Sequence, residues 1–269
     1  MLAVLALSST APAVAENKAY PDKFRLAFSG YSIDRSNATL SVTDPDLGIG
    51  VAINPRDAFG LDFDSTVLRI EGYYRFNERH ALTYGWYNLD STGSKSLEDS
   101  VDWVDRDGNE ISIPVGATVE STLDVETIKV GYLYSFYESE KVEAAIGAGF
   151  HISRLEVGLD ASVITPPNAS IQQVDTSVPL PVVSGAFRYY VTPRFQWDLR
   201  AEIFSLEFDD WYGSFIDVTF GLEYRVWKHV ALGAALTRSA LEIEEDNKDY
   251  FLQYENQLNG ALIYVATYF

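Results

Sequence analysis

The chain has 269 residues, with 39 acidic residues against 20 basic ones, a formal net charge of −19 and no cysteine. The acidic excess argues against acidic substrates and against nucleic acid, because phosphate binding requires a basic surface. The absence of cysteine excludes disulfides, zinc-thiolate sites and thiol nucleophiles. The length suits one large all-β domain or two ordinary domains.

The first fifteen residues have the pattern of a secretory signal. An apolar run over 2–7 precedes Ala13-Val14-Ala15, a small-x-small cleavage site that predicts a signal peptide over 1–15 and a single mature domain over 16–269. The alternative is a buried first helix. No later stretch reaches the roughly 18 to 20 apolar residues of a membrane-spanning helix, so insertion into a membrane would use strands.

Apolar and polar residues alternate through the rest of the chain. In 195–204, FQWDLRAEIF, the period is two, which predicts a strand with one apolar face. The same period predicts ten strands, near 24–36, 63–76, 81–92, 121–136, 142–156, 181–192, 195–207, 214–226, 230–241 and 257–269. We expect an all-β fold, a transmembrane antiparallel up-and-down barrel of about ten strands, with eight or twelve as alternatives.

The connections between these strands alternate in length. Short ones lie at 77–80, 137–141, 192–194 and 227–229, and long ones lie between them. This alternation is typical of outer-membrane barrels, and it predicts that both chain ends lie on the periplasmic, short-turn side. The alternative is a secreted lipocalin-like barrel or sandwich, which would turn its apolar face inward.

The C-terminal segment GALIYVATYF ends on Phe269, with Val265 and Ile263 on the same strand face. It resembles the C-terminal assembly signal of Gram-negative outer-membrane β-barrel proteins, although Thr267 stands where that class more often has an apolar residue. The resemblance implies a bacterial outer-membrane location, recognition by the barrel-assembly machinery, and lipid and lipopolysaccharide as surroundings. Among small barrels the chain is similar to the OmpA-like and OmpW-like group, which usually has eight strands.

If the apolar faces meet lipid, charges of both signs face the lumen. The predicted lumen network consists of Arg69, Glu71, Arg75, Lys129, Glu143, Arg188, Asp198, Arg200, Glu202, Asp217, Glu223 and Arg225. Buried charges persist when they are paired, so one hypothesis is an ion-paired plug in a structural or surface-interaction barrel. The other is a narrow porin-like channel for small solutes or ions. Neither needs a cofactor or an enzyme activity.

An enzymatic hypothesis depends on His151 and Ser153, two apart on one strand face, with Glu156 nearby. The spacing resembles the His-x-Ser motif of outer-membrane lipid A deacylases, which implies a serine nucleophile activated by histidine. The sequence disfavours this reading because the pair would face the lumen and Arg154 stands where that family has Asn.

A comparison with the ten-stranded omptin proteases, which use paired acids and a His-Asp couple at the rim, is also unfavourable. Asp209 and Asp210 stand at such a rim. His80 and His229 lie in short turns at the opposite end, so neither can join them.

The long loops carry most of the acidic residues. Asp105, Asp107 and Asn109 match the start of a calcium loop, although the full EF-hand spacing is absent. The alternative is a hairpin turn at Asp107-Gly108 in a solvated acidic surface. Divalent cations could also bridge these carboxylates to lipopolysaccharide.

Overall fold

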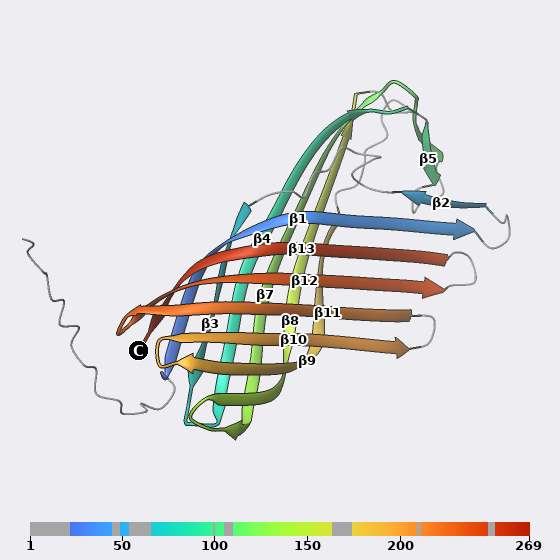
Figure 1. Ribbon diagram of the computed structural model, residues 1–269. Coiled ribbons are helices and arrows are strands. Elements are labelled where there is room, and N and C mark those ends of the chain that lie inside the picture. Colours follow the sequence, from blue (N-terminus) through green and yellow to red (C-terminus); the bar gives the residue numbers. More distant parts are fainter. Residues whose placement is uncertain are drawn as a thin grey trace, which may run out of the picture.

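The architecture is a closed antiparallel barrel, seen in a computed structural model of the chain (Figure 1). The structure describes residues 22–44, 49–53, 66–98, 100–104, 110–162, 174–208, 211–246 and 251–269. Its strands are β1 (Phe24–Asp44), β2 (Ile49–Ile53), β3 (Thr66–Arg75), β4 (His80–Ser96), β5 (Val101–Val104), β6 (Glu110–Ile113), β7 (Thr118–Glu138), β8 (Val142–Ala161), β9 (Val174–Thr192), β10 (Phe195–Phe208), β11 (Trp211–Trp227), β12 (Val230–Asp246) and β13 (Phe251–Tyr268). Across these ranges there is no helix long and apolar enough to cross a membrane.

Ten strands form the wall, in the order β1, β3, β4 and β7 to β13, and β13 pairs with β1 to close it. The prediction of about ten strands is confirmed, and the alternatives of eight and twelve are wrong. The closing pair extends to the end of the chain, where the Phe24 and Phe269 amides each donate to the other residue's carbonyl, at 2.9 and 3.0 Å. One feature was not predicted, the pairing of β2 with the tip of β1. β5 and β6 form a separate antiparallel pair on either side of 105–109, where the sequence offered a hairpin turn as the alternative to a calcium loop.

Several strands are longer than the sequence predicted. β1 and β7 have 21 residues each, whereas a tilted strand of roughly 9–11 residues crosses the bilayer. The extra length lies at the end opposite the short turns. The barrel therefore has a membrane-spanning inner half and an outer half that projects beyond the membrane.

The outward face shows where the lipid belt ends. On β13, Ile263 is 77% exposed, while the inward Arg25 of the neighbouring β1 is 6% exposed. On β8, the outward side chains change from Phe150 and Ile152 to the exposed Arg154. The secreted-barrel alternative, with its apolar face inside, is therefore wrong for the inner half.

The outer half reverses this pattern. On β7, Lys129 faces inward and Ile128 outward, but closer to the outer end Val125 faces inward and Glu126 outward. Leu89 and Ile33 are both buried and belong to one hydrophobic cluster inside the barrel. The outer half is thus arranged like a soluble barrel, with an apolar interior and a polar exterior.

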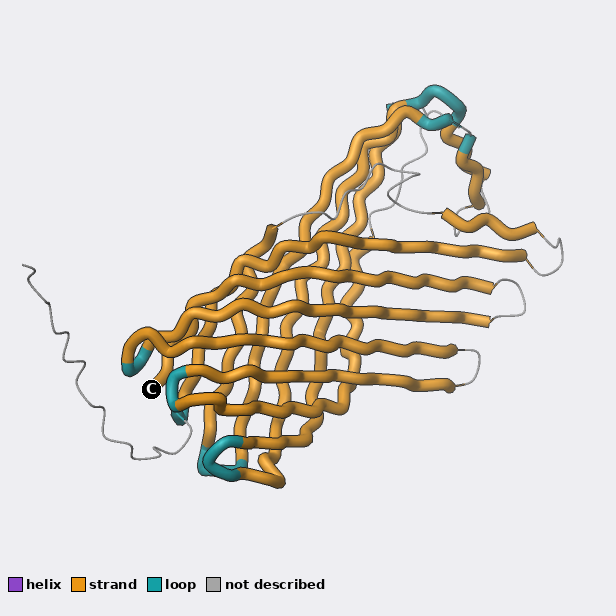
Figure 2. Tube along the Cα trace, in the orientation of Figure 1, coloured by secondary structure: helices purple, strands orange, loops and turns teal. Residues whose placement is uncertain are grey.

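The wall of the outer half is divided into two sheets. Pairing between β9 and β10 ends at Val183 and Ile203, although both strands continue through described residues. The described part of β3 pairs with β1 from Tyr74 to Thr66. Beyond these points β4, β7, β8 and β9 stay paired together, as do β10 to β13 with β1. Figures 1 and 2 show the two groups diverging toward the outer end. Among the described residues, a seam between β9 and β10 separates the two groups on one side of the wall.

Candidate functional site

Charged side chains fill the lumen of the inner half, and the twelve residues of the predicted network all lie on inward faces of the wall. Seven of them are buried, and Lys129 is partly buried: the seven are Arg69, Glu71, Arg75, Glu143, Asp198, Asp217 and Glu223. Alternation places them there because each strand directs every second residue to the same face. Their contacts form three groups that join strands across the barrel.

The first group surrounds Glu143 of β8. One of its carboxylate oxygens accepts from Arg75 at 2.6 Å and from Ser135 at 2.7 Å, and the other accepts from Arg188 at 3.0 Å. The guanidinium groups of Arg75 and Arg188 also lie over the ring of Tyr73, at 5.0 and 5.7 Å. Strands β3, β7, β8 and β9 are joined here by one carboxylate.

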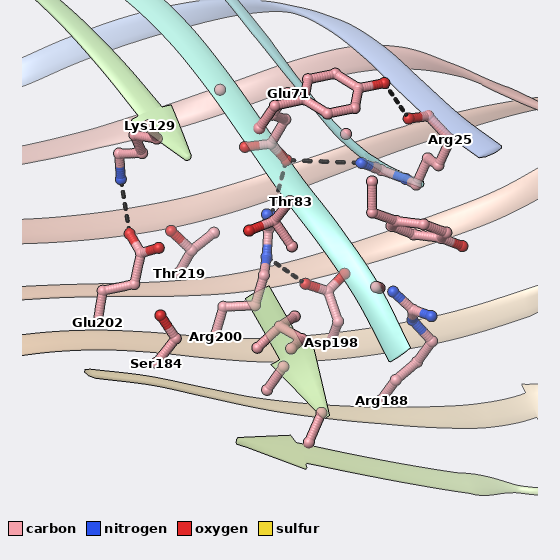
Figure 3. A pocket seen from close by; sticks show the side chains of 18 of the residues that line it. Arg25, Glu71, Thr83, Lys129, Ser184, Arg188, Asp198, Arg200, Glu202 and Thr219 are labelled. Carbon is pink, nitrogen blue, oxygen red and sulfur yellow. Dashed lines mark hydrogen bonds and ion pairs between the residues drawn. The ribbon is translucent and has the colours of Figure 1, made fainter. Parts of the chain in front are cut away.

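The second group surrounds Glu71 of β3 (Figure 3). Its carboxylate lies 2.9 Å from Arg200 of β10, 3.0 Å from Arg69 and 3.8 Å from Arg25. Arg200 also contacts Asp198 at 3.1 Å. Glu71 and Arg200 lie on opposite walls, so this pair spans the lumen.

Beside the Glu71 group, the strands that close the barrel, β1 and β13, contribute further contacts. Arg25 of β1 donates to Glu223 of β11 at 3.0 Å and to the hydroxyl of Tyr268 at 3.0 Å. Tyr268 in turn donates to Glu223. Arg225 pairs with Asp22 at 2.5 Å and lies over the Tyr268 ring.

The third group lies closest to the outer half. Lys129 of β7 lies 2.8 Å from Glu202 of β10 and 3.6 Å from Asp217 of β11. His151 of β8 places Nε2 3.0 Å from Glu202 and packs edge-on against Phe215. The charged layer therefore ends where the apolar interior begins.

The tyrosines that contact these arginines were not predicted from the sequence. Tyr31 and Tyr87 flank Arg69 at 5.8 and 5.7 Å, and Tyr264 lies 5.4 Å from Arg25. Cation–π contacts of this kind strengthen when they are desolvated. The inward parity of these positions can be read from the alternation of each strand.

A cavity of about 120 Å³ remains among the charges of the inner half. Its lining includes Arg200, Glu71, Thr83, Ser184 and Thr219, several of which are labelled in Figure 3. Charged and hydroxyl side chains stand among its lining residues, and a water needs about 10–15 Å³ of such space, so the cavity is large enough for several waters.

The proposed deacylase residues have separate partners. The hydroxyl of Ser153 lies 3.1 Å from that of Thr127, whereas His151 Nε2 lies 3.0 Å from Glu202. Glu156 pairs with Arg154 on the outward face. The three side chains thus do not converge on one another.

The remaining predictions on the loops and the leader lie outside the described residues. These are the signal peptide over 1–15, the calcium candidates Asp105, Asp107 and Asn109, and the rim pair Asp209 and Asp210.

No protein-family model matches the chain, and no curated protein matches its sequence. The structure is similar to the outer-membrane protease OmpT from Escherichia coli, with a TM-score of 0.53 and 10% identity over 93% of this chain and 97% of that one. Weaker matches are the toluene transporter TodX from Pseudomonas putida, with a TM-score of 0.37 and 8% identity over 93% and 91% of the chains, and the attachment invasion locus protein Ail from Yersinia pestis, with 0.31 and 11% over 90% and 99%.

At these identities the OmpT match shows the fold alone. It agrees with the closed wall of ten strands. The chain has the fold of a ten-stranded outer-membrane β-barrel.

Proposed function

We propose that this barrel is closed to ions and that its function is a surface interaction of the outer half. The observation that carries the proposal is the set of ion pairs that cross the lumen. Arg200 and Glu71 lie on opposite walls, whereas Arg25 with Glu223 and Lys129 with Glu202 join strands that have two others between them. Each pair holds two strands that are not neighbours in the wall. Removing one partner would leave a buried charge unpaired, so the network resists opening.

Barrel size supports the same proposal. Eight-stranded barrels are filled by their own side chains, whereas the 16 to 18 strands of porins leave an aqueous channel. Ten strands lie nearer the first case. The remaining 120 Å³ cavity favours the second candidate, a narrow conduit for small solutes or ions, because its wall includes the partly exposed Arg200.

Single-channel recording of the refolded protein in a planar bilayer separates the two candidates. Folding is checked first by unboiled gel mobility. The proposed closed barrel gives no steady openings, and Arg200→Ala or Glu202→Ala then creates or increases current because each removes one side of a sealing pair. Steady openings in the unmodified protein, altered by the same substitutions, would instead establish a charge-lined channel.

The proposal does not include hydrolysis. Ser153 and His151 have different partners, so a serine nucleophile would lack its base. Ser153→Ala is expected to leave any phenotype of the protein unchanged. Loss of a lipid-hydrolysing activity in that variant, with gel mobility intact, would overturn this part of the proposal.

A further inference from the structure

The seam between β9 and β10 is a local interruption between two strands that both continue. The two pair from their shared turn as far as Val183 and Ile203. Beyond that point β9 stays paired with β8 as far as Val174, and β10 stays paired with β11 as far as Phe208. The strands therefore remain ordered but no longer bond to each other.

The sequence supplies the cause, in the segment SVPLPVV over 177–183. The amide of Tyr190 donates to Lys141 at 2.8 Å beside β8, so the even-numbered residues of β9 bond toward β8 and the odd-numbered ones toward β10. Pro179 and Pro181 are both odd. Proline has no N–H, so two successive donors toward β10 are missing where the pairing stops.

The seam begins within the lipid-facing belt. Across the β8–β9 ladder, Pro179 pairs with Ile152 and Pro181 with Phe150. Those two side chains face outward and are 43% and 54% exposed. On the opposite margin, the outward Ile203 is 51% exposed.

Behind the seam the interior is mostly apolar, although the inward His151 of β8, opposite Leu180 in the β8–β9 ladder, packs against Phe215. The inward side chains nearest to the seam are Val182 and Leu180 on β9, Phe204 and Leu206 on β10, and Phe215 on β11. Leu206 faces the interior beside Gly213 yet is 54% exposed. Space next to it is therefore unfilled by the described residues.

The interior of the outer half behind the seam, lined by Val182, Leu180, Phe204, Leu206 and Phe215, is called the outer chamber below. We propose that it binds the hydrocarbon chain of an amphipathic lipid, which enters sideways from the outer leaflet through the β9–β10 seam. The inference rests on the proposed function, because the ion-paired layer at Glu202 and Lys129 forms the floor of the chamber. Continuity of the seam with the lipid belt identifies the occupant. A chain dissolved in the leaflet reaches Leu206 along apolar surface, and transfer between two apolar surroundings avoids exposure to water.

Photolabelling tests the inference with palmitic acid that carries a diazirine on its chain, added to the full-length barrel in phosphatidylcholine vesicles. Labelled residues are mapped by mass spectrometry. We expect labelling of the inward Phe204 and Leu206 besides the outward belt. Leu206→Arg should reduce inward labelling at least tenfold, whereas Ser205→Arg, on the outward face of the same strand, should leave it unchanged.

A reversible staple tests the route. The chain has no cysteine, so Pro181→Cys with Ser205→Cys introduces one pair across the seam. Oxidation should reduce inward labelling at least fivefold, and reductant should restore it, with belt labelling constant.

Two results would overturn the inference: no inward labelling of a folded, non-conducting barrel, or inward labelling that the oxidised staple leaves unchanged. The first result would leave the proposal of a barrel closed to ions unaffected. Ion conductance of the unmodified protein, by contrast, would overturn the proposed function and is read in a separate assay.

Discussion

Glu143 provides the sharpest test of the ion-paired lumen. It is 7% exposed, and its two oxygens contact Arg75 at 2.6 Å and Arg188 at 3.0 Å. Glu143→Ala therefore leaves two guanidinium groups in the lumen without this carboxylate. Breaking a buried pair in this way costs about 3–5 kcal/mol. Glu143 also borders the cavity of about 120 Å³, where water can rehydrate part of the uncovered charge, so we expect a loss at the lower end of that range, about 3 kcal/mol.

The assay is urea unfolding of the refolded barrel in vesicles, followed by unboiled gel mobility. Glu140→Ala, in the exposed turn of the same hairpin, is the control and should change stability by less than about 0.5 kcal/mol. Replacing the whole group, with Glu143→Met, Arg75→Met and Arg188→Met together, should recover most of the loss because no unpaired charge remains. Equal unfolding midpoints for Glu143→Ala and Glu140→Ala would refute the argument.

Three further predictions concern the wall. Gly233→Val should destabilise the barrel by about 1–3 kcal/mol, because a Cβ there would lie 2.1 Å from the Tyr264 ring, whereas Gly185→Val, with nothing within 4 Å, should be tolerated in the same urea assay. Ile263→Arg on the lipid face should cost about 2–4 kcal/mol, while Gln257→Arg, further along the same outward face, should cost much less; equal costs would contradict the position of the belt. Deleting Phe269 removes both terminal hydrogen bonds to Phe24, worth about 1 kcal/mol each, and should lower the heat-modifiable fraction more than Phe269→Ala, which keeps the backbone.

Local patterning made most of the wall predictable. Alternation and turn length identify ten strands because a period of two and a short polar turn each act within a few residues. They also place Arg69, Glu143 and Glu202 inside once the apolar face is assigned to lipid. Even the end of the β9–β10 pairing is encoded locally, by Pro179 and Pro181, although which neighbour loses the donors depends on the register.

The outer half was not distinguished from the inner half in the sequence. Apolar and polar residues keep alternating at the point where the apolar residues change from the outward face to the inward face. In LDVETIKV, over 123–130, the inward residues change from Val125 to Lys129 without a break in the strand. The predicted strand limits, near 36 on β1 and 121 on β7, fell short of the observed ends at Asp44 and Thr118. On β1 a register shift between Ile33 and Arg35 changes which residues face inward, and alternation alone does not show such a shift. A reversal of phase along one strand is the signal that would have revealed the outer chamber.

The sequence by itself determined the strands, the alternation of short and long connections between them, and the charge of the interior, since these depend on residues close together in the chain. Only the tertiary structure decided which charges meet. Glu71 reaches Arg200, and Arg25 reaches Glu223, across a closed barrel whose register brings together residues more than a hundred positions apart. Pairing across a lumen depends on closure and stagger of the whole wall, which no local pattern contains.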